Sequence, residues 1–138
     1  MSPAIYWLPA ALMSLVCYGL WGFFSKLAIQ NINAKSALVY QSIGFTLIGF
    51  LTLLLLHYKP DVQLKGVGYG LLAGVATAVG SLFFLIAADR GKVSTIVTLT
   101  ALYPIITIFL AYVFLKEGIN LRQSIGIVMA LIAIRLLS

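Results

Sequence analysis

Hydroxyl and aromatic side chains recur at helical spacing in one apolar stretch near the start of the sequence. They are Ser14, Tyr18, Trp21 and Ser25, separated by four, three and four residues. Residues three and four apart lie on one face of an α-helix, so these side chains would form a single stripe. The stripe could enclose a small solute with its rings and orient it with its hydroxyls. It is also typical of a packed helix face whose aromatic residues lie near lipid headgroups.

A second group of such side chains surrounds a proline. Thr100, Tyr103 and Thr107 flank Pro104 in an otherwise apolar run. Proline lacks an N–H and its ring clashes with the carbonyl four residues earlier, so Pro104 predicts a kink and a free acceptor at Thr100. We expect Pro104 to act as a hinge, and the three residues around it to contact the solute.

Three more polar residues interrupt apolar runs. Thr77 and Ser81 are four residues apart and share a helix face. They could offer hydroxyls to a ligand, although hydrogen bonds back to their own helix are the commoner outcome. Gln41 carries an amide that must find a partner or line a wet cavity. For Gln41 a structural hydrogen bond is favoured over a substrate contact.

The elements that must position these residues are membrane-spanning helices. The 138 residues are 62% hydrophobic and 9% charged, whereas roughly a quarter of the residues in a soluble domain are charged. Crossing the hydrocarbon takes about 20 helical residues, and the lack of alternation argues against barrel strands. The predicted fold is an all-α integral membrane protein with one domain over 1–138. Its five transmembrane helices are expected at about 4–29, 37–56, 66–88, 93–115 and 121–137.

Motifs and charge distribution argue against several functional classes. The sequence has no phosphate-binding glycine loop and no H-E-x-x-H motif, and its three acids, Asp61, Asp89 and Glu117, lie in loops or at predicted helix ends. We therefore expect no enzyme, no cofactor and no metal. The formal net charge is +6, but the nine Lys and Arg are scattered over helix ends. This distribution favours membrane lipids as partners and argues against nucleic acid.

Three segments, in this order, resemble the EamA-type repeat of the drug/metabolite transporter superfamily. They are W-G-F-F-S-K at 21–26, A-A-D-R-G-K-V-S at 87–94 and L-Y-P-I-I-T-I-F-L-A-Y-V-F-L-K-E-G-I-N-L-R-Q-S-I-G at 102–126. The resemblance implies a solute carrier whose first, third and fourth helices, with part of the second, surround a central cavity. Full-length members typically contain two such repeats, so this chain is expected to be half-size. It would move a small polar or amphipathic metabolite or drug by alternating access.

The resemblance also bears on assembly and coupling. Two successive five-helix repeats face opposite ways, so a lone repeat would form this pair only as an antiparallel dimer. Four Lys or Arg fall on the N-terminal side and five on the other, which agrees with dual topology. We expect a homodimer, or a pair with a second half-size subunit, in the plasma (inner) membrane of a prokaryote. The first helix lacks the glutamate of the small multidrug resistance exporters, so their proton-coupled mechanism is not expected.

Two other functions stay open at the level of the sequence. One is a flippase subunit for a lipid-linked substrate, working with a different half-size partner. The other is a membrane scaffold or regulator without transport, in which the small residues of 66–88 and 121–137 would be interaction surfaces. Both keep the same helical membrane fold.

Overall fold

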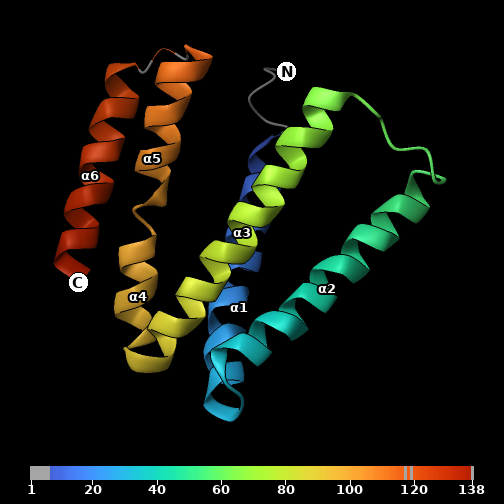
Figure 1. Cartoon of the computed structure of the whole chain (residues 1–138). Helices are drawn as coiled ribbons and strands as arrows, with labels where there is room; N and C mark the ends of the chain where they lie inside the picture. Colours follow the sequence, from blue (N-terminus) through green and yellow to red (C-terminus); the bar gives the residue numbers. More distant parts are fainter. Residues whose placement is uncertain (1–6, 117, 119, 138) are drawn as a thin grey trace. The chain divides into compact units, whose positions relative to one another are not determined.

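The structure is a computed structural model that describes residues 7–116, 118 and 120–137. The described residues are helical, without strands (Figure 1). The chain divides into two compact units, Met1–Arg90 and Gly91–Ser138. The predicted all-α fold is confirmed for the described part of the chain.

The first unit consists of three long helices, α1 (Trp7–Asn31), α2 (Ala34–Leu55) and α3 (Leu64–Arg90). A short turn joins α1 to α2. In that turn the Asn33 side chain accepts a hydrogen bond from the Ser36 N–H at 2.8 Å. This N-cap satisfies one of the unpaired donors at the start of α2.

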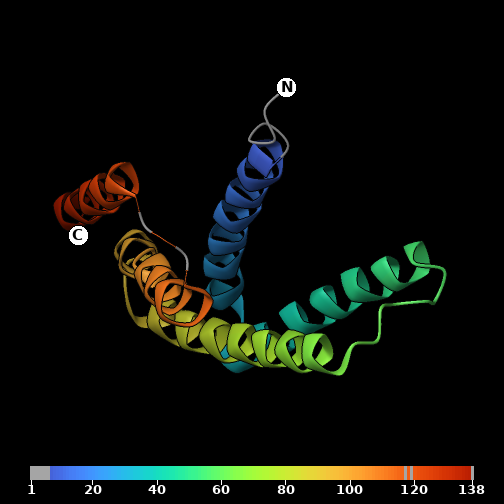
Figure 2. The same ribbon diagram turned by 90° about the horizontal axis from the view of Figure 1, so that it is seen from above.

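The three helices of this unit converge near the turn between α1 and α2 and diverge towards their other ends (Figures 1 and 2). All three contact one another. The buried residues are confined to the converging end and are Gly22, Ser25 and Ile29 of α1, Ala37 of α2, and Ser81, Phe84, Leu85 and Ala88 of α3. Most of the remaining apolar side chains are exposed, as expected for helix faces that meet lipid.

The second unit contains α4 (Val93–Thr100), α5 (Tyr103–Leu110), a short π-helix η2 (Ala111–Leu115) and α6 (Leu121–Leu137). The helix predicted over 93–115 is therefore interrupted by a turn at 101–102. Pro104 lies in the first turn of α5. At that position the missing N–H removes no helical hydrogen bond, so the chain forms a new helix start where a kink within one helix was expected.

Among the described residues, four segments are long and apolar enough to cross a membrane: Trp7–Asn31, Ala34–Leu55, Leu64–Arg90 and Val93–Leu115. The helix expected at 121–137 is present as α6, with 17 residues. That length is at the lower end of the range of helix lengths that cross the hydrocarbon, and α6 is not one of the four segments. The structure therefore supports four spans, and the prediction of five is not confirmed.

Candidate functional site

A cluster of polar and aromatic side chains lies where the three helices of the first unit converge. We call Trp21, Ser25, Gln41 and Phe84 the polar junction. Trp21 and Ser25 are one turn apart on α1, Gln41 comes from α2 and Phe84 from α3. Each helix of the unit thus contributes at least one side chain to the cluster.

A hydrogen bond joins α1 to α2 within the polar junction. Gln41 Nε2 donates to Ser25 Oγ at 2.9 Å, and Ser25 is only 2% exposed. The structural hydrogen bond favoured for Gln41 is present. Such bonds between membrane helices contribute about 0.6 kcal/mol on average and up to about 1.7.

An aromatic contact joins α1 to α3 in the same place. The ring centroids of Trp21 and Phe84 are 4.7 Å apart at an interplanar angle of 39°, and Phe84 is buried. The spacing is within the usual range for aromatic pairs, which stabilise by roughly 0.5–1.5 kcal/mol beyond the area they bury. The contact fixes where the indole N–H of Trp21 lies.

Two buried polar atoms of the polar junction have no hydrogen-bond partner among the described residues: Trp21 Nε1 and Gln41 Oε1. Leaving a buried donor or acceptor unpaired costs about 1–3 kcal/mol. An unmatched group of this kind in a native protein calls for an explanation, such as an ordered water, an ion or a bound ligand. The polar junction therefore offers one donor and one acceptor to an incoming molecule.

Lys26, the residue after Ser25, contributes to the scaffold around the junction. Its Nζ donates to the backbone carbonyl of Ala88 at 2.6 Å. A cation at the C-terminal end of a helix is favourable because the last carbonyls carry partial negative charge. This bond ties α1 to the last turns of α3.

The structure brings together only part of the predicted stripe on α1. Trp21 and Ser25 enter the polar junction, but Ser14 and Tyr18 are exposed on the earlier turns of the helix. Ser14 Oγ donates to the carbonyl of Ala10 at 3.0 Å. The stripe leaves the protein interior because α1 diverges from its neighbours towards its N-terminus (Figure 2).

The two predicted hydroxyl residues of α3 have different environments. Ser81 is 5% exposed and lies one turn before Phe84. Thr77 is exposed, and its hydroxyl donates to the carbonyl of Ala73 at 2.9 Å. Hydrogen bonding back to the helix, the outcome expected to be commoner, is thus found at Thr77.

The predicted site residues around Pro104 belong to the second unit. Thr100 Oγ1 donates to the carbonyls of Ile96 and Val97, and Thr107 Oγ1 donates to that of Tyr103 at 3.4 Å. Tyr103 is 62% exposed. Both threonine hydroxyls therefore bond within the helical backbone of their own unit.

Sequence reasoning did not single out Phe84, and for Gln41 it favoured a structural hydrogen bond over a substrate contact. A signal for Phe84 was present: Thr77, Ser81, Phe84 and Ala88 follow the same spacing of four, three and four as the stripe on α1. For Gln41 the sequence indicates that the amide needs a partner, but not that one of its two polar atoms stays unpaired.

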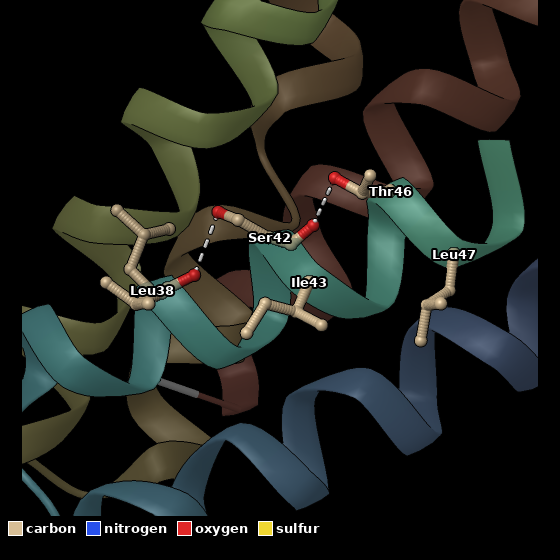
Figure 3. A pocket seen from close by; sticks show the side chains of 6 residues that line it. Leu38, Ser42, Ile43, Thr46 and Leu47 are labelled. Carbon is tan, nitrogen blue, oxygen red and sulfur yellow. Dashed lines mark hydrogen bonds between the residues drawn. The ribbon is translucent and has the colours of Figure 1, made fainter. Parts of the chain in front are cut away.

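A shallow hollow runs along α2 and is lined by Leu38, Val39, Ser42, Ile43, Thr46 and Leu47 (Figure 3). Ser42 Oγ donates to the carbonyl of Leu38 at 2.9 Å, and Thr46 Oγ1 donates to that of Ser42 at 2.8 Å. Both hydroxyls are thus turned back onto their own helix. The hollow presents mainly apolar surface and does not resemble a site for a polar solute.

The described residues contain no group of three or more His, Cys, Asp or Glu that could hold a metal ion. Four helical segments long and apolar enough to cross a membrane, found among the described residues, are features of an integral membrane protein. Comparison with known proteins gives the class: the model of the EamA-like transporter family matches residues 5–138. The chain belongs to the EamA-like transporter family.

Two relatives agree with this assignment. A protein of Methanocaldococcus jannaschii, described as uncharacterized, is 35% identical over 129 residues, which make up 92% of each chain. A protein of Staphylococcus aureus named "probable glucose uptake protein" is 30% identical over 116 residues, 84% of this chain and 39% of that protein. No solved structure matches the chain significantly. The resemblance seen in the sequence is confirmed, and the chain is a membrane transporter and not an enzyme.

Proposed function

We propose that the chain is a half-size transporter that moves a small polar or amphipathic solute by alternating access, and that the solute binds at the polar junction. The observation that carries this proposal is the pair of buried, unpaired atoms Trp21 Nε1 and Gln41 Oε1. They belong to α1 and α2, which with α3 are long and apolar enough to cross a membrane, in a chain of the EamA-like transporter family. A solute that pairs with both atoms offsets the cost of burying them.

The helix arrangement supports a mechanism in which the junction opens. α1, α2 and α3 meet at one end only (Figure 1), so few packed side chains need to separate when the converging ends move apart. Small rigid-body movements of packed helices are a common route between two states. The interruption of the fourth span before Pro104 supports the further proposal that this proline marks a hinge.

The proposed assembly is an antiparallel homodimer, or a pair with a second half-size subunit, in a prokaryotic plasma membrane. The Methanocaldococcus relative matches over nearly its whole length, whereas the match leaves more than half of the Staphylococcus relative uncovered. A second copy of opposite orientation would supply an equivalent second repeat. The exposed length of α2, whose one buried residue is Ala37, would then be available for contacts with the partner.

Transport by the purified chain in proteoliposomes tests the proposal. Labelled amino acids, sugars including glucose, nucleotides and cationic drugs are offered to wild type, Gln41→Leu and a control, Gln30→Leu. Gln30 is exposed near the end of α1, so its replacement removes an amide outside the junction. We expect saturable flux of at least one solute in wild type and in the control, and a KM about three- to tenfold higher in Gln41→Leu.

Two results would overturn the proposal. Absence of flux, together with absence of ligand-dependent stabilisation across the panel, would favour a scaffold without transport. Equal flux in Gln41→Leu and Gln30→Leu would show that the chain transports the solute but that the solute does not bind at the polar junction.

A further inference from the structure

We infer that the polar junction selects uncharged, hydroxyl-bearing solutes such as sugars and polyols. The inference rests on the proposed function and adds the chemical class of the solute. It depends on three observations. One donor and one acceptor in the junction are unpaired, and the aromatic ring of Trp21 lies beside them. The third is that the Lys26 ammonium already donates a hydrogen bond to the Ala88 carbonyl.

The unpaired donor of the junction, Trp21 Nε1, determines what kind of ligand atom can pair with it. An indole nitrogen donates a hydrogen bond and never accepts one, and the Trp21 ring is held against Phe84 at 4.7 Å. The ligand atom opposite Trp21 Nε1 must therefore be an acceptor. The indole itself adds an apolar surface beside this atom, which suits the C–H face of a sugar ring.

The acceptor side is more adaptable because of Ser25. A serine hydroxyl both donates and accepts, so it can pair with either polar atom of the Gln41 amide. With Nε2 bonded to Ser25 at 2.9 Å, Oε1 is the unpaired atom. A hydroxyl can both accept and donate, so a solute that bears hydroxyls carries the acceptor that Trp21 Nε1 requires and the donor that Gln41 Oε1 requires.

Charge at the junction argues against ionic solutes. Lys26 donates to the carbonyl of Ala88 at 2.6 Å, so this cation is engaged by the scaffold. Of the acids in the described residues, Asp61 lies in the loop between α2 and α3, and Asp89 in the last turn of α3. The side chains of the junction itself include no acid that could pair with a cationic solute, and an anionic solute would have to share Lys26 with the Ala88 carbonyl. Burying a charge that is not fully paired is far more costly than burying a hydroxyl.

The two tryptophans of the chain allow a direct binding measurement. Trp7 is 61% exposed at the start of α1, and Trp7→Phe leaves Trp21 as the sole indole. The reconstituted Trp7→Phe protein is titrated with glucose and mannitol, and with the charged counterparts glucose 6-phosphate, gluconate and glucosamine. We expect a saturable change in Trp21 emission with at least one neutral probe, and at least about tenfold weaker binding of every charged one.

Removing each hydrogen-bonding group then tests the assignment of atoms. Trp21→Phe keeps an aromatic ring against Phe84 but deletes the N–H, and Gln41→Leu deletes the amide. Calorimetric titration should show about three- to tenfold weaker binding of the neutral probe for each change, the loss expected for one neutral hydrogen bond. The matched controls Trp7→Phe and Gln30→Leu should bind as wild type does, and thermal unfolding confirms that each variant is folded.

The inference is wrong if the charged counterparts bind as tightly as the neutral probes, if no neutral probe binds, or if Trp21→Phe leaves the affinity unchanged. Measurements of flux distinguish these outcomes from failure of the proposed transport function. If a charged solute is transported and Gln41→Leu raises its KM, the chain is a transporter that uses the polar junction, but the inference that its solute is uncharged is wrong. Absence of flux for every solute would remove both.

Discussion

Ser25→Ala should destabilise the first unit through its effect on Gln41. The serine is 2% exposed, and its hydroxyl accepts from Gln41 Nε2 at 2.9 Å. Because Oε1 of the same amide is already unpaired, the substitution leaves the whole amide without a partner inside the junction. The cost of one more unpaired buried donor is about 1–3 kcal/mol.

The double variant Ser25→Ala/Gln41→Leu should recover much of this loss. Replacing both partners of a buried hydrogen bond by apolar groups of similar shape is often nearly neutral. Gln41→Leu alone should cost no more than about 1 kcal/mol, since the Ser25 hydroxyl can bond to the carbonyl one turn earlier. The double-mutant cycle should therefore give a coupling energy of about 0.6–1.7 kcal/mol.

Reversible unfolding in mixed micelles measures these free energies. Ser42→Ala is the matched control, because the exposed Ser42 hydroxyl bonds only within α2; it should change the free energy of unfolding by less than about 0.5 kcal/mol. Additive effects of Ser25→Ala and Gln41→Leu, within about 0.3 kcal/mol, would show that the two side chains are not coupled and would refute the reasoning.

Three further changes test the scaffold and the hinge. Lys26→Met removes the bond to the Ala88 carbonyl at 2.6 Å and should lower stability by about 1 kcal/mol in thermal unfolding; an unchanged midpoint would argue against a role for that bond. Asn33→Ala removes the N-cap that accepts from Ser36 at 2.8 Å and should cost about 1 kcal/mol, while Asn33→Asp restores it; hydrogen exchange in the first turn of α2 reports the local loss. Pro104→Ala supplies the missing N–H at the interruption between α4 and α5 and should slow solute flux at equal protein abundance; flux equal to wild type would remove the proline as a hinge.

The helical fold follows from the sequence because each span depends mainly on the length and apolarity of its own residues. The three helices of the first unit occur within a few residues of their expected positions, and α2 begins where Asn33 provides a cap. The interruption at 101–102 is different. Pro104 predicts a defect, but whether it forms a kink or a new helix start depends on backbone geometry that local pattern does not determine.

The candidate site was predictable only in part, because the burial of its residues depends on how three helices pack together. Helical spacing correctly groups Trp21 with Ser25, since both lie on one face of α1. It also groups them with Ser14 and Tyr18, which are exposed because the helices diverge. Spacing along one helix shows which residues share a face. Which turns of that face become buried depends on where the other two helices pack against it.

Solute uptake by proteoliposomes containing Trp21→Phe or Trp7→Phe tests the central claim, that the polar junction binds the transported solute, most directly. Both variants lose one indole N–H, but only that of Trp21 is buried and unpaired in the junction. We predict that Trp7→Phe keeps the wild-type KM for the neutral solute and that Trp21→Phe raises it about three- to tenfold. An equal KM in the two variants, at equal amounts of folded protein, would contradict the claim.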